Sequence, residues 1–246
     1  MKIVSLSDFH GDLLINDFIP ECDVVCICGD FSPLGIQCSI AMNGAMAGWI
    51  RNEFIPWLEG LPCKKVIVIA GNHDFVTEPD WFPVWFSSNT SDKIVYLANE
   101  SYTYNDINFY GCPYSDIPGW AWSAAGNPSL YTIPENTDVV LVHQAPNWGD
   151  LGLTFNHWKG WNNYGSISLL SRVDDAMPRL LLCGHIHNGN HNDICYETRG
   201  KECVMVNCSI KDEDYELWYA PQEIIIDKDT VRVLPWALLN NETFTK

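Results

Sequence analysis

The sequence predicts an α/β fold in which two mixed β-sheets pack against each other between flanking helices. Five short apolar runs, rich in Val and Ile, are continuous rather than alternating, as is typical of strands that are buried on both faces. These runs are Ile3–Leu6, Val24–Cys28, Val66–Ala70, Val139–Val142 and Leu180–Cys183. Shorter segments separated by polar pairs predict further strands, and two stretches have helical periodicity.

In the first half of the chain, a helix is predicted over Ala45–Leu58 after the first two apolar runs, and Gly60 and Pro62 end it. Its apolar side chains fall near one face. They are Met46, Ile50, Phe54, Trp57 and Leu58. The third apolar run follows this helix directly.

Short alternating segments come next, at Ile94–Leu97, Tyr102–Tyr104 and Ile107–Tyr110, and the pair Asn105-Asp106 marks a hairpin. We expect these segments to begin the second sheet. We expect the fourth and fifth apolar runs to return to the first sheet, with a helix over Ser166–Met177 between them. The strands that complete the sheets are predicted at Val204–Asn207, Glu223–Ile226 and Val231–Leu234.

The composition favours one globular unit. The 246 residues include no Gly/Ser linker, repeat or low-complexity stretch, and 47% are hydrophobic, which is enough for a sizeable core. The polar motifs described below run from Asp8 to His187, so one site needs most of the chain. We therefore predict a single domain over residues 1–246.

The formal net charge of −17 restricts the partners of the protein. Proteins that bind long nucleic acids usually present a basic surface, so such a partner is disfavoured. A small phosphate ester remains compatible, because divalent ions reverse the local sign of the charge. The simplest interpretation of the excess acid is a solvated surface.

Ten cysteines raise the question of disulfides. Cys26, Cys28 and Cys183 lie inside apolar runs, where thiols pack as small hydrophobic groups, so we expect a reducing environment. The first strand begins at Lys2, which leaves no room for a signal peptide, and no apolar stretch approaches the length of a membrane span. We therefore expect a cytoplasmic protein without a membrane partner.

Polar residues follow each of the five apolar runs. The groups are Asp8-Phe9-His10, Gly29-Asp30, Gly71-Asn72-His73-Asp74, His143 and Gly184-His185-Ile186-His187. Because the strands would deliver these residues from the same end, we expect them to gather along one edge of a sheet, where open α/β sheets place their sites.

These residue types suit a hydrolytic site with two metal ions. Such a site needs oxygen and imidazole ligands and one carboxylate that bridges both ions. The candidate ligands are Asp8, His10, Asp30, Asn72, His143, His185 and His187. Because no cysteine belongs to the set, a structural zinc site is not expected. We expect two divalent transition-metal ions, with Mn, Fe, Zn and Ni all suited to this mixture.

The five motifs, in this order, resemble the calcineurin-like metallophosphoesterases, whose pattern is Asp-x-His, Gly-Asp, Gly-Asn-His-(Glu/Asp), a lone His and Gly-His-x-His. A narrower resemblance, to the small single-domain metallophosphoesterase-domain proteins of vertebrates and microbes, covers most of the chain up to Ser209. Ser7–Gly11, Gly29–Gly35, Ile69–His73 and Phe109–Pro113 carry it. The resemblance implies a four-layer sandwich of two packed mixed β-sheets flanked by helices, with the metal site at the strand ends.

The resemblance also implies a role for each residue. The first metal would be held by Asp8, His10, Asp30 and His187, and the second by Asp30, Asn72, His143 and His185, with Asp30 as the bridge. His73 is expected to face the substrate phosphate and to protonate the leaving oxygen without binding metal. Asp74 follows where many members have Glu, and we group it with His73 among the catalytic residues as a supporting side chain.

One element of the protein-phosphatase branch is missing. That branch has Asp-Arg-Gly just after its Gly-Asp, and the Asp orients the catalytic histidine. Here the segment from Gly29 to Gly35 reads Gly-Asp-Phe-Ser-Pro-Leu-Gly. The absence of Asp-Arg-Gly therefore argues against phosphoprotein substrates, and it leaves open what orients His73.

The loops between Tyr114 and Trp161 are rich in tryptophan. The five are Trp120, Trp122, Trp148, Trp158 and Trp161. One interpretation is a lid whose indole rings stack on a base, with Trp120 and Trp122 as substrate-binding residues. The alternatives are a satellite hydrophobic cluster under long loops or a dimer contact. We expect His157 and His191, which also fall in loops, to be surface histidines.

Taken with the resemblance, the residues predict a metal-dependent phosphoric ester hydrolase. A small phosphodiester is the favoured substrate, with a cyclic nucleotide as the leading candidate, cleaved by a hydroxide activated at the metals with His73 as general acid. The alternatives are a phosphomonoesterase for nucleotides or metabolites, and a nucleotide-binding protein with weak residual activity. The intact ligand set argues against the last. The sequence leaves the oligomeric state open, a homodimer included.

Overall fold

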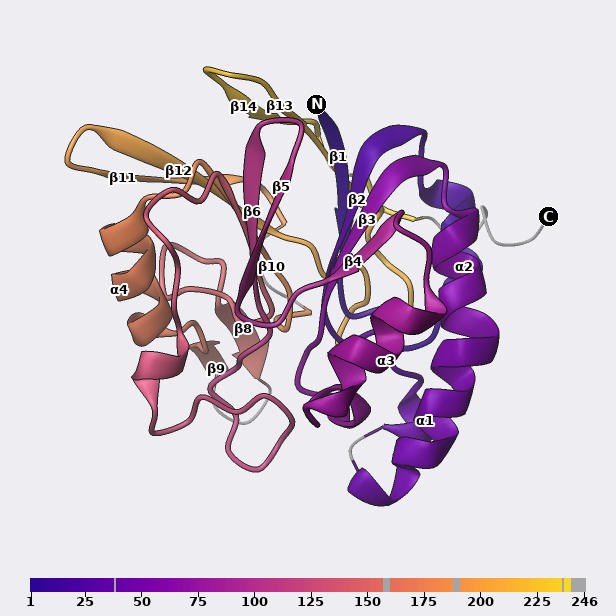
Figure 1. The fold of residues 1–246 in the computed structure, drawn as a ribbon. Helices are drawn as coiled ribbons and strands as arrows, with labels where there is room; N and C mark the ends of the chain where they lie inside the picture. The colour runs from indigo at the N-terminus through magenta and orange to yellow at the C-terminus, as the bar shows by residue number, and fades with distance from the viewer. Residues whose placement is uncertain (38, 157–159, 188–190, 236, 240–246) are drawn as a thin grey trace.

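The computed structural model describes residues 1–37, 39–156, 160–187, 191–235 and 237–239. In this part of the chain the strands form two six-stranded sheets and a small two-stranded sheet, and the helices lie outside the two large sheets (Figure 1). The α/β sandwich predicted from the sequence is therefore confirmed.

The first sheet has the strand order β14-β13-β1-β2-β3-β4. Strands β1 to β4 are parallel to one another, and β13 and β14 add an antiparallel pair beside β1. The bounds are β1 Lys2–Leu6, β2 Cys22–Cys28, β3 Cys63–Ile69, β4 Ile94–Tyr96, β13 Gln222–Ile226 and β14 Val231–Val233.

The second sheet has the strand order β11-β12-β10-β7-β6-β5. Its four central strands are parallel, and β11 and β5 run antiparallel at the two edges. The bounds are β5 Glu100–Tyr104, β6 Ile107–Cys112, β7 Val139–Val142, β10 Leu180–Cys183, β11 Ile194–Thr198 and β12 Lys201–Asn207.

The helices and the small hairpin complete the described fold. The helices are α1 Asn43–Trp49, a π-helical turn Ile50–Phe54, α2 Ile55–Gly60, α3 Trp81–Asn89 and α4 Ile167–Ala176, and the hairpin pairs β8 Leu153–Asn156 with β9 Gly160–Asn163. Short 3-10 turns lie at Leu13–Phe18, Leu34–Ile36, Ile40–Met42, Phe75–Thr77 and Pro128–Leu130.

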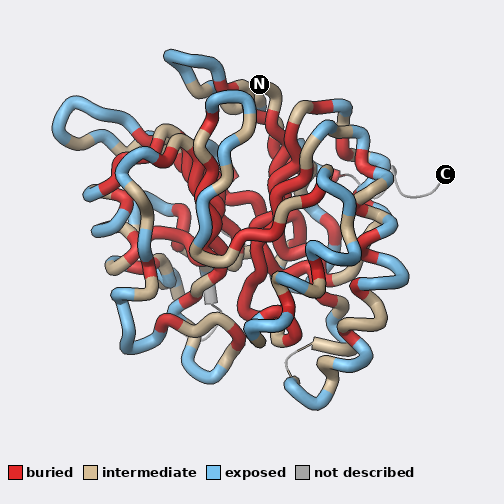
Figure 2. The backbone as a smooth tube through the Cα atoms, viewed as in Figure 1, coloured by how far each residue is buried: buried red, intermediate tan, exposed pale blue. Residues whose placement is uncertain are grey.

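Side-chain alternation along the strands builds the layers. In β2, Val24 packs between the two sheets, whereas its neighbour Val25 packs on the opposite face, in the same core cluster as Met46 of α1. Leu169 and Val173 of α4 cover the outer face of the second sheet. The layers are therefore helices, sheet, sheet and helix, and Figure 2 shows buried backbone concentrated in the central strands.

Three strands lie in a different sheet from the one predicted. β7 and β10 belong to the second sheet, where Val139 pairs with both Phe109 of β6 and Leu180 of β10. β4, at Ile94–Tyr96, forms the edge of the first sheet beside β3. The reason is that strands buried on both faces are apolar in either sheet, so their composition does not specify the sheet that they join.

The helix predicted at Ala45–Leu58 is confirmed, since helical structure covers Asn43–Gly60. The helix predicted at Ser166–Met177 is also confirmed, and α4 covers all of it except the two end residues, which are the caps. Helix α3 was not predicted, because its apolar residues include exposed Trp81 and Val84 as well as buried Phe82 and Phe86, so no apolar face stands out. The hairpin β8–β9 and the edge strand β11 were also not predicted, because their sequences show no clear strand pattern.

The chemistry of the interior agrees with the sequence. Nine cysteines fall in the described residues and all are free thiols, and Cys26, Cys28 and Cys183 are fully buried. Within the described residues, none of the helices combines the length and apolar character needed to cross a membrane.

Candidate metal centre

The predicted ligands follow the carboxyl ends of five strands: Asp8 and His10 after β1, Asp30 after β2, Asn72 after β3, His143 after β7, and His185 and His187 after β10. The sequence predicted that these residues gather along one edge of a single sheet. Because β1–β3 belong to the first sheet and β7 and β10 to the second, the site lies instead where the two sheets meet. The structure nevertheless brings the ligands together.

Potential metal-ligating atoms come within 4.8 Å of one another in three overlapping groups of side chains. The groups are Asp8 with His10 and His187, Asp8 with Asp30 and His143, and His10 with Asp30 and His73. Asp30 belongs to two of these groups and Asp8 to two, so the carboxylates join the histidines of both sheets.

Glycines in the motifs permit this close approach. A Cβ atom on Gly29 would lie 2.6 Å from Nδ1 of His143, and one on Gly71 would lie 2.7 Å from Cε1 of the same ring. Gly29 also has a φ of +96°, which side chains rarely adopt. The motif glycines are therefore needed because His143 packs directly against the backbone of both loops.

Four of the candidate ligands have a left-handed backbone conformation. The φ values are 58° for Asp8, 46° for His10, 51° for Asp30 and 71° for His185. Positive φ is uncommon for residues other than glycine, and strained backbone of this kind clusters at functional sites. The turns that follow the strands thus aim these side chains at a common point.

Three histidines have one ring nitrogen fixed by an oxygen acceptor. Nδ1 of His10 donates to Oε1 of Gln37 at 3.1 Å, Nδ1 of His143 donates to the carbonyl oxygen of Cys28 at 2.9 Å, and Nδ1 of His187 donates to the carbonyl oxygen of Asp212 at 2.9 Å. A proton on Nδ1 leaves the lone pair on Nε2 for a metal, and metal-binding histidines are usually oriented in this way.

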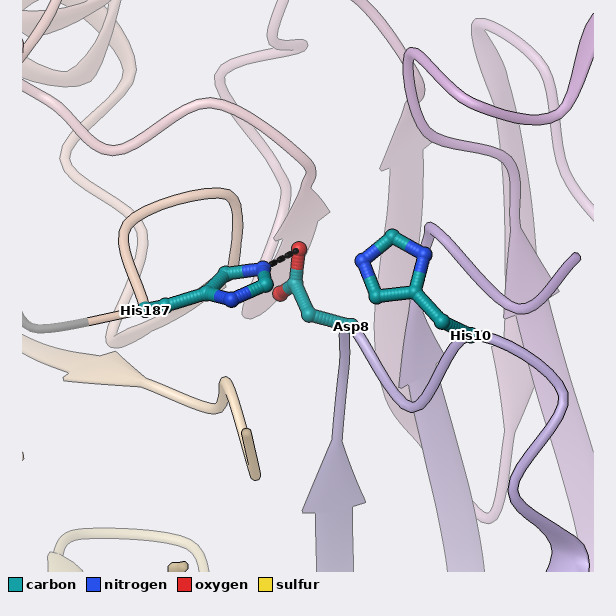
Figure 3. Close-up of side chains that lie close together, drawn as sticks. All are labelled: Asp8, His10 and His187. Atoms are coloured by element: carbon teal, nitrogen blue, oxygen red, sulfur yellow. Dashed lines mark ion pairs between the residues drawn. The ribbon is translucent and has the colours of Figure 1, made fainter. Parts of the chain in front are cut away.

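Asp8 lies between His187 and His10 (Figure 3). Its Oδ1 atom is 3.5 Å from Nε2 of His187. Oδ1 of Asp8 and Nε2 of His10 are buried, and neither has a hydrogen-bond partner among the described residues. The other carboxylate oxygen, Oδ2, accepts from the backbone N–H of His185 at 2.9 Å and from Oγ of Ser209 at 2.7 Å. Buried atoms of this kind, which lack a hydrogen-bond partner and belong to one group of potential metal ligands, fit a bound cation.

Asp30 occupies the middle of the cluster. Its Oδ1 atom accepts the backbone N–H of His73 at 2.8 Å, which fixes the carboxylate. Its Oδ2 atom lies 3.4 Å from Nε2 of His143 and 3.7 Å from Nε2 of His73. On the far side, Oδ1 of Asn72 lies 2.9 Å from Nε2 of His143, and the rings of His143 and His185 are 5.1 Å apart. This set of carboxylate, imidazole and amide donors fits bound divalent metal.

The neighbouring charges and burial shift the pKa values of most groups in the site. Burial opposes ionisation of Asp8 and Asp30, but the neighbouring histidines outweigh it and hold the pKa of both carboxyl groups below the usual range. Burial lowers the pKa of His10 to about 4 and, with the charge of His143, that of His185 to about 3. Burial also acts against protonation of His143, but the charge of Asp30 raises its pKa to about 9.

Asp74 supports the loops and does not face the pocket. It is fully buried. Its Oδ2 atom accepts the backbone N–H groups of Gly71 at 2.8 Å and Asp30 at 2.9 Å, and its Oδ1 atom accepts the N–H of Ser32 at 3.0 Å and the Ser32 hydroxyl at 2.5 Å. Burial, and then the charge of Asp30, raise its pKa to about 7 against these hydrogen bonds. Asp74 thus ties the loop after β2 to the loop after β3.

A pocket of about 390 Å³ opens over the cluster. Asp30, Asn72, His73, His185 and His187 line it from the ligand loops, and Trp120, Thr154, Tyr164, Glu213 and Tyr215 are part of its wall. The His73 side chain is 12% exposed, and its ring centre lies 4.5 Å from that of Trp120. His73 and Trp120 therefore both reach the space where a substrate would bind.

The other tryptophans are placed differently. Trp122 is outside the pocket lining: its Nε1 donates to Oγ1 of Thr77 at 2.7 Å and its ring packs against the outer core of the first sheet. Trp148 packs edge-on against Tyr196, and Trp161 is 67% exposed beside Phe155. Trp158 and His157 lie outside the described residues.

The sequence predicted a surface histidine at position 191, but His191 is buried. It is 6% exposed, stacks on Tyr219 with ring centres 3.6 Å apart, and donates from Nε2 to the carbonyl oxygen of His187 at 3.2 Å. The sequence placed it in a loop, and the fold packs that loop against Tyr219 behind the last ligand.

Several residues of the site were not identified from the sequence. Gln37 and Ser209 hold His10 and Asp8. Tyr215, with a φ of 62°, places its ring centre 5.0 Å from His10 and 5.1 Å from His187. These residues lie outside the motifs themselves, and no spacing rule in a single sequence points to them.

Known proteins share the sequence pattern and the fold. The family model of the calcineurin-like phosphoesterases matches residues 1–189. Metallophosphoesterase domain-containing protein 1 of Homo sapiens is 28% identical over 218 residues, which cover 76% of this chain and 61% of that protein. UPF0046 protein C25E10.12 of Caenorhabditis elegans is 27% identical over 248 residues, which cover 92% of this chain and 80% of that protein.

This chain thus spans about three fifths of the human relative's length. A solved crystal structure that is 12% identical covers 96% of this chain and 99% of its own, with a TM-score of 0.63, and so has the same fold. The family match ends two residues beyond His187 and includes every motif that supplies a candidate metal ligand. This chain therefore belongs to the calcineurin-like phosphoesterases, a family of metal-dependent phosphoester hydrolases.

Proposed function

We propose that this protein hydrolyses small phosphodiesters with two divalent metal ions, and that cyclic nucleotides are its favoured substrates. The observation that carries the proposal is the convergence of buried acceptor atoms, above all Oδ1 of Asp8 and Nε2 of His10, that have no hydrogen-bond partner among the described residues. The first ion is assigned to Asp8, His10, Asp30 and His187. The second is assigned to Asp30, Asn72, His143 and His185.

When bound, the two ions would polarise the phosphate and supply a nucleophilic water at neutral pH. The residues of the chain would balance the charge of the ions and orient their ligands. The carboxylate of Asp30, held by the backbone N–H of His73, offsets the repulsion between two cations. The oxygen partners of His10, His143 and His187 keep their Nε2 lone pairs directed at the site.

His73 is assigned as the general acid. It lines the pocket and is partly exposed, and its Nε2 atom lies 3.7 Å from Oδ2 of Asp30. A proton delivered from its imidazole would neutralise the leaving alkoxide, a contribution that is typically about 10²–10⁴-fold.

The charge of the pocket supports a diester over a monoester. Among the described residues that line it there is no lysine or arginine, and Glu213 adds a negative charge to its wall. A phosphomonoester carries about −1.5 to −2 charges near pH 7, whereas a diester is singly charged. With only the metals to neutralise the substrate, the singly charged ester is the better fit.

The size and wall of the pocket support a nucleotide-sized substrate. Its volume of about 390 Å³ falls in the range of small-molecule sites, roughly 300–1,000 Å³. Trp120, Tyr164 and Tyr215 provide aromatic rings on which a base could stack. The net charge of −17 disfavours long nucleic acids.

A substrate panel tests the proposal. The protein is stripped of metal, reloaded with Mn²⁺, and assayed at fixed salt on bis-nitrophenyl phosphate, nitrophenyl phosphate, cyclic nucleotides and single-stranded DNA. We expect the diesters to exceed the monoester, and cyclic nucleotides to exceed DNA. A clear preference for nitrophenyl phosphate or for DNA would contradict the proposal, and so would equal rates with and without metal.

A further inference from the structure

The loop that carries Trp120 is fastened to the segment that carries His73. The backbone N–H of Ala121 donates to the carbonyl oxygen of Asn72 at 3.2 Å. The backbone N–H of Trp122 donates to Oε1 of Glu78 at 2.9 Å, and its Nε1 donates to Oγ1 of Thr77 at 2.7 Å. Three hydrogen bonds thus join residues 121 and 122 to the chain on both sides of His73.

Trp120 and Trp122 point in different directions from this anchored loop. Trp122 has a φ of 50°, packs against the outer core of the first sheet, and makes an edge contact with Tyr114 at 5.6 Å. Trp120 instead lines the pocket. The hydrogen bonds of Ala121 and Trp122 therefore hold the backbone from which the ring of Trp120 projects.

Two rings and a carboxylate contact the imidazole of His73. Trp120 packs against it at a tilt, with ring centres 4.5 Å apart and planes at 55°, and His10 contacts it edge-on at 4.9 Å and 79°. Oδ2 of Asp30 lies 3.7 Å from its Nε2 atom. Since His10 is itself fixed by Gln37, Trp120 is the pocket-side boundary of the space open to His73.

We propose that Trp120 is the positioning residue for His73, and that Trp122 is the anchor that keeps Trp120 in place. The proposal rests on the proposed role of His73 as general acid. It assigns to an aromatic ring the task that the carboxylate of an Asp-Arg-Gly element would perform, which the segment Gly29–Gly35 lacks. Misplacing a catalytic group by about 1 Å can cost about 10²-fold in rate, so a packing contact is enough to matter.

A pair of base-free diesters separates positioning from base stacking. Methyl nitrophenyl phosphate and methyl phenyl phosphate share the methyl ester group but differ in the leaving group. Phenolate needs a proton to depart more than nitrophenolate does. We expect Trp120→Ala to lower kcat on the phenyl ester about 10- to 100-fold, and on the nitrophenyl ester less than about 3-fold. Trp120→Phe should recover most of the loss, Trp122→Phe should reproduce part of it, and metal content should be unchanged.

A second readout does not depend on turnover. In metal-free protein, diethyl pyrocarbonate modifies accessible imidazoles, and peptide mass spectrometry gives the rate at each histidine. We expect Trp120→Ala to increase the rate at His73 several-fold and to leave the rate at buried His191 unchanged. Trp81→Ala, on helix α3, is the matched control. It should leave the modification rates at His73 and His191, and kcat, unchanged.

The outcomes are distinguishable. Equal losses on the two esters, or an unchanged modification rate at His73, would overturn the positioning role. A rise in KM for nucleotides only, with both base-free esters unaffected, would overturn it in favour of base stacking. If His73→Ala itself shows no dependence on the leaving group, the general-acid role fails, while the modification rate still reports whether Trp120 confines His73.

Discussion

Oδ1 of Asn72 lies 2.9 Å from Nε2 of His143, while the other ring nitrogen of His143 donates to the carbonyl oxygen of Cys28. Without metal, this contact requires a proton on Nε2, and the raised pKa of His143, about 9, is consistent with that proton. A metal ion bound to Nε2 of His143 would take the place of this proton. The metal-free protein therefore carries in His143 a positive charge where the proposed second ion would bind.

The first prediction is two bound ions per chain. Metal-free protein titrated with Mn²⁺ should take up two equivalents and release protons, because protonated His143 must give up its Nε2 proton. Calorimetry in two buffers of different ionisation enthalpy measures the released protons, and elemental analysis counts the ions. One equivalent or none, in protein prepared without chelator, would count against the assignment.

Asp30→Asn should lose at least one ion and nearly all turnover. An amide carries no charge to offset two cations, although it can still accept the N–H of His73. Elemental analysis and the rate on bis-nitrophenyl phosphate test this together. Asp17→Asn, at an exposed position, is the matched control and should retain both. A variant at Asp30 that keeps both ions and a near-normal rate would remove the bridging role.

His73→Ala should keep both ions, because His73 is assigned to proton transfer and not to ligation. We expect a loss of about 10²–10⁴-fold on substrates with an alkyl or ribose leaving group. The loss should be much smaller for nitrophenolate, which departs without a proton. Loss of metal in this variant would show that His73 is a ligand instead.

The stability of the metal-free protein should fall as the pH rises from 7 to 9. The folded-state pKa of His143 is raised from 6.5 to about 9, so its proton stabilises the fold fully below 6.5 and this contribution is lost as the pH passes about 9. The pKa of His187, which Asp8 raises against the effect of burial, acts in the same direction. For His143 the loss is on the order of 3 kcal/mol.

Urea unfolding at pH 7, 8 and 9 measures this loss, with chelator and with Mn²⁺. The loaded protein should show a smaller change, because metal binding already requires neutral imidazoles. His143→Gln should flatten the profile of the metal-free protein. A metal-free wild type that is equally stable at pH 7 and pH 9 would contradict the prediction.

Asp74→Asn should destabilise the fold as well as the site. Asparagine offers one acceptor oxygen where the carboxylate offers two, and its NH₂ group would face N–H donors of Gly71 and Asp30 or of Ser32. Each buried donor left unsatisfied costs about 1–3 kcal/mol. Thermal unfolding with and without Mn²⁺ measures the effect. Unchanged stability would show that the loops hold their positions without Asp74.

The positions of the candidate ligands at strand ends could be predicted from the sequence because each one follows a strand that reads as a continuous apolar run. Val24–Cys28 and Leu180–Cys183, for example, occur as strands with their polar residues at the carboxyl ends. What it could not give was the sheet to which each strand belongs. That choice depends on pairing across distant segments, such as Val139 with Phe109, and any buried strand is apolar enough for either sheet.

The surroundings of the site were the least predictable part. Gln37, Tyr215 and the turn that brings Asp212 to His187 act through single contacts made after the chain has folded. Trp120 and Trp122 are two residues apart and of the same type, yet only Trp120 reaches the pocket. The positive φ of Trp122 separates their directions, and a residue's identity does not reveal its backbone conformation.

The division of the ligands between two sheets has a consequence for the order in which the protein matures. A chain that has been synthesised only as far as β4 contains Asp8, His10, Asp30 and Asn72 but lacks His143 and His187. Strand β13, which pairs with β1 in the first sheet, is made later still. In the proposed assignment the second ion lacks its full ligand set before His185 emerges from the ribosome, and the first ion before His187, so metal capture is a late step in biogenesis. Occupancy of both sites therefore distinguishes chains that extend through His187 from shorter ones.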